Sequence, residues 1–265
     1  MENLILIKLG GGLITDKKRA FYARGDIIRR LGKEILEARK SCKDKIILAH
    51  GSGSFGHVVA KKYKTSEGLV NNSSFKGLTL VADAAIKINR IVMLQMLRIG
   101  LPVVSFSPAS LIFAKNREQR NCFVDPIFRA LELNYLPVLY GDVVFDSEEN
   151  GFCIFSSEKV LEVIAGQARG RFKLRILYCG DTEGVYGTNG ETIGCLTRKS
   201  FSKIKGTIKG SGGVDVTGGM LHKVEESVEM ATKWGVETVI FSGKDKGNLW
   251  KAIVGKSVRG TKITQ

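Results

Sequence analysis

The sequence predicts an α/β fold, a three-layer αβα sandwich around a mainly parallel central sheet. Three observations lead to this prediction. Short apolar segments typical of strands alternate with amphipathic segments typical of helices, the first two strands run into glycine-rich loops, and no repeat of fixed period interrupts the alternation. The chain has 265 residues, which suits one large domain or two tightly fused small ones.

The first three elements form a β-loop-α-β unit. LILIKL at 4–9 is apolar and stops at GGG, and KIILAH at 45–50 stops at GSG, so each is typical of a buried strand ending in a glycine loop. Between them, residues 26–40 place apolar side chains on one helical face and basic side chains opposite. Such a unit is the building block of a parallel sheet.

The alternation continues to the C-terminus. Helices are expected over 75–100, 125–134, 157–168, 220–235 and 248–255. Strands are expected over 101–106, 135–146, 174–180 and 236–243. A polar, basic and glycine-rich stretch at 188–219 breaks the pattern, and we expect a lid or an irregular insert there.

Composition limits the function classes. Forty-one Lys and Arg against 26 Asp and Glu give a formal net charge of +15, which favours anionic partners. The basic residues are scattered and no RNA-binding or zinc-finger pattern occurs, so a small phosphorylated ligand explains the charge and no nucleic-acid partner is predicted. Five widely spaced cysteines without a CxxC pair indicate reduced thiols. With no long apolar run and no leader, the chain is expected to be cytoplasmic, without membrane insertion.

Two glycine loops follow neighbouring strands of this predicted sheet. Lys8 leads into the triple glycine of IKLGGGLITDK, whose backbone N–H groups can approach an anion closely. The stretch matches neither a Walker loop nor GxGxxG, and a simple tight turn is an open alternative. The second loop, HGSGSFGH, contains two histidines: His50 is predicted to be structural, whereas His57 is either a phosphate ligand at the start of a helix or a solvated loop residue.

Two later stretches have the same character. In DVTGGMLHK a glycine pair opens a helix and Lys223 follows one turn inside it, so both the helix end and the lysine can face polyphosphate. In YCGDTEGVYG a strand end carries Asp181, which either caps a turn or contacts a nucleotide.

The motifs KLGG, HGSGSFGH, YGDVV, CGDTEGVYG and DVTGGMLHK occur in an order and spacing that closely resembles the isopentenyl phosphate kinases of the amino acid kinase superfamily. The resemblance runs from Ile5 to about Thr261. It implies a single amino acid kinase domain over 1–265, with an acceptor lobe at about 1–170 and a nucleotide lobe at about 171–265. It also implies transfer of the γ-phosphoryl group of ATP to isopentenyl phosphate with Mg²⁺, and a homodimer joined through the central sheet and the long helix.

The resemblance also implies roles for the donor half of the site. Lys8 would bridge the transferring phosphoryl group and Lys17 would stabilise the transition state, although Lys18 beside it leaves the register open. Asp142 would organise the lysines. Because charge spreads over the phosphoryl oxygens, positioned cations and backbone donors supply the catalysis without a covalent intermediate. The ATP contacts implied are Gly10, Gly11, Gly12, Gly53, Asp181, Gly184, Gly219 and Lys223.

For the acceptor half, the resemblance implies that His57 binds the phosphate of isopentenyl phosphate. Ser52 and Gly53 would line the junction with the donor, and Ser157 would contact the substrate. The apolar tail needs an apolar pocket. The helix at 76–99 would provide it with Leu78, Val81, Ala82 and Ala85, whose small size is compatible with dimethylallyl or longer prenyl phosphates.

Two departures from the family pattern stand out. The family's usual serine after KLGG is Gly12 here, so a hydroxyl near the phosphates is missing. Ser157, Glu158 and Lys159 stand where relatives tend to have a glycine and two acidic residues, and Glu158 can replace an aspartate in orienting lysines.

Other functions stay open at this point. One is a kinase of the same superfamily for another small anion, such as a fosfomycin-like phosphonate or a carboxylate. Another is a non-catalytic nucleotide-binding regulator, because fold does not dictate function. The presence of Lys8, Lys17 and Lys223 favours the kinase, since a regulator needs no complete set of transition-state cations.

Overall fold

A sheet of eight strands forms the centre of the protein, in the order β10-β12-β11-β9-β1-β2-β6-β3. This computed structural model describes residues 1–65, 68–69, 72–148, 151–207 and 219–265. Neighbouring strands from β11 to β3 run parallel, whereas β12 is antiparallel to β11. The strands are β1 (Glu2–Leu9), β2 (Lys45–His50), β3 (Val103–Ser105), β6 (Leu136–Tyr140), β9 (Phe172–Gly180), β10 (Cys195–Leu196), β11 (Glu237–Ser242) and β12 (Gly260–Ile263).

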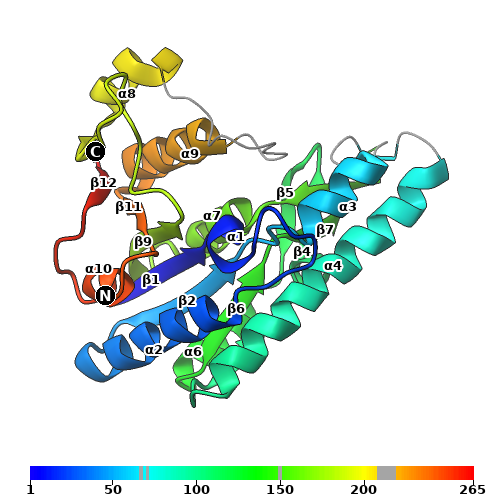
Figure 1. Cartoon of the computed structure of the whole chain (residues 1–265), viewed down its shortest axis with the longest axis horizontal. Helices are drawn as coiled ribbons and strands as arrows, with labels where there is room; N and C mark the ends of the chain where they lie inside the picture. Colours follow the sequence, from blue (N-terminus) through cyan, green and yellow to red (C-terminus); the bar gives the residue numbers. More distant parts are fainter. Residues whose placement is uncertain (66–67, 70–71, 149–150, 208–218) are drawn as a thin grey trace.

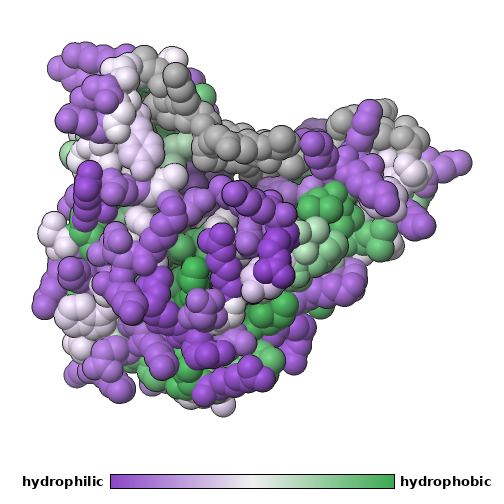
Figure 2. Space-filling view, in the orientation of Figure 1, coloured by the Kyte–Doolittle hydropathy of each residue, from purple (hydrophilic) through white to green (hydrophobic). Residues whose placement is uncertain are grey.

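Helices cover both faces of the sheet, which confirms the three-layer sandwich (Figure 1). One hydrophobic cluster lies under α1 (Gly11–Ile14), α2 (Gly25–Ser41), α3 (Gly56–Tyr63), α4 (Asn72–Leu97) and α10 (Asn248–Ile253). The cluster on the opposite face lies under α6 (Asp125–Glu132), α7 (Ser157–Ala168), α8 (Arg198–Ile204) and α9 (Gly219–Trp234). Hydrophilic side chains cover most of the outer face shown in Figure 2, with small separate hydrophobic patches.

Side chains of β1 alternate between the two clusters. Ile5 and Ile7 belong to the cluster under α2 and α4, whereas Leu4 and Leu6 belong to the cluster under α7 and α9. Because a strand has a side-chain period of two, Lys8 lies on the α7 and α9 face. The sheet therefore directs this lysine between those two helices at the end of its central strand.

The chain changes direction across the sheet between β1 and β9. From β1 it builds β2, β6 and β3 on one side, and it then returns to build β9 and β11 on the other. In open parallel sheets, ligands bind outside the carboxyl ends of the strands at such a switch point. Gly10 lies there, and its N–H donates to the carbonyl oxygen of Cys179 on β9 at 2.8 Å.

Several elements differ from the prediction. The expected strand over 135–146 is divided at Gly141. There the chain leaves the main sheet after β6, and β7 (Asp142–Phe145) forms a separate hairpin with β8 (Phe152–Phe155). A Cβ on Gly141 would lie 3.1 Å from the backbone N of Ser157, so α7 packs directly against this bend. The short helix α5 (Pro108–Leu111) and the hairpin of β4 (Ile112–Lys115) and β5 (Glu118–Cys122) were not predicted, because segments of only 4 or 5 residues are too short to show a clear period. The stretch at 188–219 contains β10, α8 and the 3₁₀ helix η2 (Lys205–Thr207) in its described part; residues 208–218 lie outside the described residues.

A buried carboxylate joins the two hairpins. Asp146, just after β7, accepts hydrogen bonds from the backbone N–H of Asn116 and Arg117 in the turn between β4 and β5, at 3.1 and 2.6 Å, and from Glu148 at 3.0 Å. Burial would raise the pKa of Asp146, but these hydrogen bonds outweigh it and lower the pKa. The charge therefore stabilises the left-handed turn residues Asn116 and Arg117.

We expect Asp146→Asn to lower the free energy of unfolding by about 1.5–3 kcal/mol, the usual contribution of hydrogen bonds to a charged group. Urea unfolding at pH 7 measures the change. Glu148→Gln, a charge-matched variant in the same turn whose backbone bond to Asp146 is unaltered, should stay within about 0.5 kcal/mol of the wild type. Equal losses in the two variants would contradict the role given to Asp146.

Candidate active site

The two glycine loops predicted from the sequence touch each other. A Cβ on Gly11, after β1, would lie 2.5 Å from the backbone N of Gly53, after β2. No real Cβ approaches a backbone atom so closely, so a side chain at Gly11 would push the loops apart. Gly53 also has a φ of +50°, a left-handed conformation that favours glycine. The close approach brings backbone N–H groups from both loops to one place at the end of the sheet.

Thr15 links the two loops and was missed by the sequence analysis. Its buried Oγ1 donates to the carbonyl oxygen of Gly11 at 2.7 Å and accepts from the N–H of Ser54 at 3.0 Å. A Cβ on Gly53 would lie only 2.1 Å from this oxygen. No sequence signal separates this threonine from an ordinary turn residue, because its second partner lies 39 positions away.

Lys8 meets a carboxylate and a second lysine beside these loops. Its Nζ lies 2.6 Å from Oε1 of Glu158, in the first turn of α7. The Nζ of Lys223, on α9, lies 3.5 Å from the same oxygen. Three elements from both halves of the chain thus bring two ammonium groups to one carboxylate.

The charges of this trio depend on each other. Burial alone would raise the pKa of Glu158, but the positive charges of Lys8 and Lys223 outweigh it and hold the pKa well below its usual range. Glu158 is therefore ionised at neutral pH, and its position near the start of α7 favours a negative charge as well. One carboxylate balances only one of the two lysines, so the trio has a net charge of +1 that can attract an anion.

Asp142, predicted to organise the lysines, is bonded to groups of β7 and to Ser107. At the start of β7 it accepts from the N–H of Val143 at 2.8 Å and from the hydroxyl of Ser107 at 3.2 Å. Burial raises its pKa to about 6, against the lowering effect of these bonds. The carboxylate that lies against Lys8 and Lys223 is Glu158, whereas Asp142 lies between β7 and α5, and its role in organising the lysines stays a prediction.

The two histidines of the second loop differ as predicted. His50 is fully buried, with a ring nitrogen 3.2 Å from Oδ1 of Asn89 and its ring stacked on Tyr140, and burial lowers its pKa. Its structural role is confirmed. His57 lies partly exposed in the first turn of α3, where its backbone N–H donates to the carbonyl oxygen of Gly53 at 3.2 Å. Its role as a phosphate ligand stays a prediction.

Lys17 bridges the two halves of the sheet end. Its Nζ lies 2.9 Å from Oδ2 of Asp181, after β9. The backbone N–H of neighbouring Lys18 donates to Oδ1 of Asp16 at 2.9 Å. The Lys17 ammonium group thus lies beside Asp181 at the end of the sheet, and its role as the second lysine of the site stays a prediction.

The two remaining glycines predicted for the nucleotide half, Gly184 and Gly219, occupy their positions for different structural reasons. A Cβ on Gly184 would lie 2.6 Å from Oγ1 of Thr261, so packing against β12 explains this glycine without a ligand. Gly219 is the first residue of α9 and has a φ of +67°. It turns the chain into the helix that carries Lys223 one turn later.

Two serines lie close to the glycine loops. The hydroxyl of Ser157 donates to Oε2 of Glu158 at 3.1 Å, and a Cβ on Gly51 would lie 3.8 Å from that hydroxyl. Ser52 packs against the start of α3, because a Cβ on Gly56 would lie 2.3 Å from its Oγ. Both positions agree with the expected surroundings of a bound acceptor, whose contacts stay predictions.

The residues predicted to hold the acceptor tail lie on the inner side of α4, which contacts α3 and β7. Two are buried and two are partly buried: Val81 and Ala85, then Leu78 and Ala82. Val81 belongs to the same hydrophobic cluster as Val143 of β7 and Phe152 of β8, and Leu78 and Ala82 pack against that cluster. These side chains therefore contribute to the core, and their role toward a tail stays a prediction.

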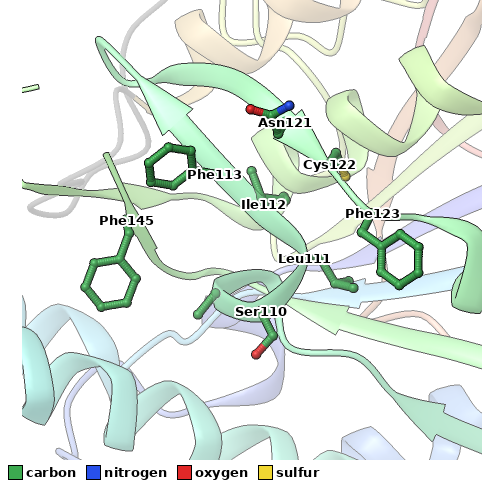
Figure 3. Close-up of a pocket in the computed structure, with 9 residues that line it drawn as sticks. Ser110, Leu111, Ile112, Phe113, Asn121, Cys122, Phe123 and Phe145 are labelled. Atoms are coloured by element: carbon green, nitrogen blue, oxygen red, sulfur yellow. The ribbon is translucent and has the colours of Figure 1, made fainter. Parts of the chain in front are cut away.

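An open hollow of about 330 Å³ lies elsewhere, along α5, β4 and β5. Figure 3 shows Phe113 and Phe145 at one end of it and Phe123 at the other. None of its lining residues was predicted to bind the tail. The full lining is Ala109, Ser110, Leu111, Ile112, Phe113, Asn121, Cys122, Phe123 and Phe145.

Another buried carboxyl group, that of Glu226, lies on α9 and was not predicted. Its Oε1 lies 3.2 Å from Nε2 of His222. Burial and the negative charges of Glu162 and Glu158 raise its pKa to about 8, although nearby lysines lower it. Glu226 is therefore mostly protonated at neutral pH and adds no compensating charge near Lys223.

Comparisons with known proteins identify the family of this chain. The model of the amino acid kinase family matches residues 3–242. The isopentenyl phosphate kinase of Methanocaldococcus jannaschii is 32% identical, over 98% of this chain and 98% of its own length. That of Methanothermobacter thermautotrophicus is also 32% identical, over 98% and 99%. An X-ray structure of an isopentenyl phosphate kinase superimposes with a TM-score of 0.82 at 28% identity, covering 98% of this chain and 100% of the other. These similarities confirm the resemblance found in the motifs.

Among the described helices, none is long and apolar enough to cross a membrane.

The raised pKa of Glu226 predicts a pH dependence of stability. A carboxyl group whose pKa rises on folding stabilises the folded state below its unfolded pKa, near 4.5, and that contribution is lost as pH rises through about 8. Between pH 5 and 8 the wild type should therefore lose up to about 1.4 kcal/mol per pH unit more than Glu226→Gln. Urea unfolding across pH 5–9 measures this difference.

Glu225→Gln is the matched control, because Glu225 is the neighbouring carboxylate and pairs with Lys205 at a more exposed position. This control should keep the slope of the wild type. If wild type and Glu226→Gln lose stability in parallel from pH 5 to 8, the Glu226 carboxyl group is not protonated in the folded protein over this range.

Proposed function

This chain belongs to the amino acid kinase family, and on that basis we propose that it transfers the γ-phosphoryl group of ATP to isopentenyl phosphate, forming isopentenyl diphosphate and ADP. The observation that carries the proposal is the pair of lysines, Lys8 and Lys223, that share the partly buried carboxylate of Glu158 beside two touching glycine loops. A site with excess positive charge and converging backbone N–H groups suits a phosphoryl group in transfer.

The donor half fits the phosphates of ATP. Gly11 and Gly12 leave backbone N–H groups open to phosphate oxygens at the switch point of the sheet, whereas the N–H of Gly10 is bonded to Cys179 and fixes the turn that precedes them. Lys223 would meet the phosphates from α9, and the start of that helix at Gly219 would add its positive end. Asp181, at the end of β9, would lie toward the nucleoside side.

Mg²⁺ is part of the same proposal. Across the described ranges, no group of three or more His, Cys, Asp or Glu side chains is placed to hold a metal ion. Mg²⁺ commonly keeps several waters and is bound through one or two carboxylates and the phosphates of its substrate. We therefore propose that the ion would be held chiefly by ATP, where it neutralises phosphate charge.

The chain's own residues would act by position and charge. Lys8 would contact the phosphoryl group between donor and acceptor, with Glu158 holding its ammonium group in place. Lys17 would approach from the opposite side of the Gly10–Gly12 loop. As negative charge spreads over the phosphoryl oxygens, these fixed cations stabilise the transition state more than the ground state. No side chain needs to become covalently phosphorylated.

The acceptor half would be the loop after β2 and the start of α3. His57, in the first turn of that helix, would donate to a phosphate oxygen of isopentenyl phosphate, and the positive end of α3 would favour the same anion. Ser52 and Gly53 would line the junction, with Ser157 nearby. The apolar tail would extend toward α4, past Val81 and Ala82.

A homodimer and a division into an acceptor lobe and a nucleotide lobe complete the proposal. Ile86, Leu94 and Leu97 of α4 are about half exposed apolar side chains on one helix, which supports α4 as the contact between two copies. The main sheet runs through both proposed lobes without a break. The cytoplasmic location stays a prediction.

We predict ADP release from ATP with isopentenyl phosphate, measured in a coupled assay beside dimethylallyl and geranyl phosphates, glutamate, uridylate and fosfomycin. Isopentenyl phosphate should give the highest kcat/KM. Lys8→Met should lower kcat about 10²–10³-fold, the usual loss when one transition-state contact is removed. Turnover confined to fosfomycin or a carboxylate would show a different acceptor, and the absence of turnover with every acceptor would favour a nucleotide-binding regulator.

We predict that His57→Ala lowers kcat/KM for isopentenyl phosphate about 10–100-fold, because a hydrogen bond to a charged group contributes about 1.5–3 kcal/mol. The KM for ATP should change little. His57→Gln, which keeps an N–H donor, should recover part of the loss. Full activity of His57→Ala would remove this residue from the acceptor site.

A further inference from the structure

The ion pair between Lys17 and Asp181 passes directly over Gly12. A Cβ on Gly12 would lie 2.4 Å from Cε of Lys17, 3.1 Å from its Nζ and 3.0 Å from Oδ2 of Asp181. Both members of the pair therefore occupy the space that a side chain at position 12 would fill. The crossing joins the loop after α1 to the loop after β9, above the predicted phosphate cradle.

The backbone does not explain why position 12 is glycine. Gly12 lies inside α1, and it is not among the glycines with positive φ. A glycine inside a helix normally weakens it, so the residue must be favoured by something else. The nearest atom to the missing Cβ is the far end of a flexible lysine. The glycine thus provides the space in which Lys17 reaches Asp181.

Stability does not explain the ion pair either. The Lys17 side chain is 56% exposed and that of Asp181 is 30% exposed. Pairs this exposed contribute little to the stability of a fold. What the pair does change is the freedom of a long side chain, because a lysine loses most of its rotamers once its ammonium group is held.

We propose that Asp181 is a positioning residue for Lys17, holding its ammonium group over the phosphate cradle, and that Gly12 makes this arrangement possible. The inference rests on the proposed kinase function and assigns a part of that site which the sequence left open. In the resemblance, position 12 carries a serine and Asp181 contacts the nucleoside. In this chain, the absence of a side chain at position 12 leaves the space in which Lys17 pairs with Asp181.

Chemical labelling tests the arrangement without any activity. Acetic anhydride reacts with free amines, and an ammonium group held by a carboxylate reacts more slowly than one in water. In the wild type, fragment-ion mass spectrometry should show slower acetylation of Lys17 than of neighbouring Lys18. In Asp181→Asn and in Gly12→Ser the two rates should become equal. Equal rates already in the wild type would overturn the proposal.

Kinetics test the positioning role. Asp181→Asn should lower kcat about tenfold, the scale of coupling between charged groups in contact. It should cause almost no further loss in a Lys17→Met background, because the lysine it positions is gone. Gly12→Ser should lower kcat by a similar factor at an unchanged Tm, since the serine displaces only the ends of the Lys17 and Asp181 side chains. Asp44→Asn, a matched loss of one carboxylate that bonds Asn3 at 3.0 Å, should leave kcat unchanged.

The outcomes separate this proposal from the kinase function. If Asp181→Asn lowers kcat equally in both backgrounds, or raises only the KM for ATP, Asp181 contacts the nucleotide independently of Lys17 and the proposal is wrong. If the wild type does not phosphorylate isopentenyl phosphate, the kinase function fails, whereas the labelling result still decides whether Asp181 and Gly12 position Lys17.

Discussion

The site depends on a direct contact between two backbones. The loops after β1 and β2 approach so closely that a Cβ on Gly11 would lie 2.5 Å from the N of Gly53, and Thr15 bonds to both loops. Adjacent parallel strands place their carboxyl ends side by side, but only glycine lets the loops that follow them touch. A donor phosphate held by one loop and an acceptor phosphate held by the other would then be neighbours without any movement of the sheet.

Buried charge adds the second constraint. Two lysines and one carboxylate in a site of low solvent exposure would be costly if any member lacked a partner. Glu158 solves this by bonding Lys8 and approaching Lys223, so that β1, α7 and α9 share one charge cluster. The remaining positive charge is what an incoming polyphosphate would neutralise. Stability and the proposed binding of phosphate would therefore depend on the same three side chains.

Local patterns predicted much of this protein, and long-range contacts supplied the rest. The short apolar runs LILIKL and KIILAH predicted two central strands. The GGG and GSG that follow them predicted both loops, because glycines directly after a strand can be recognised from neighbouring residues alone. The pairing of Lys8 with Glu158 spans 150 positions and the bond of Thr15 to Ser54 spans 39, so neither leaves a signal in a short window. The division of the expected strand at Gly141 was also not predicted, and it places Asp142 in a separate hairpin of β7 and β8.

Thr15 holds the loop after β1 against the loop after β2. The most direct measurement is the kcat of Thr15→Val beside Thr15→Ser, with Tm measured for both proteins. Valine keeps the volume but loses both hydrogen bonds, whereas serine keeps the hydroxyl. The account predicts a kcat at least about tenfold lower for Thr15→Val at temperatures where it is folded, and near wild-type turnover for Thr15→Ser. Wild-type kcat in a folded Thr15→Val protein would contradict it.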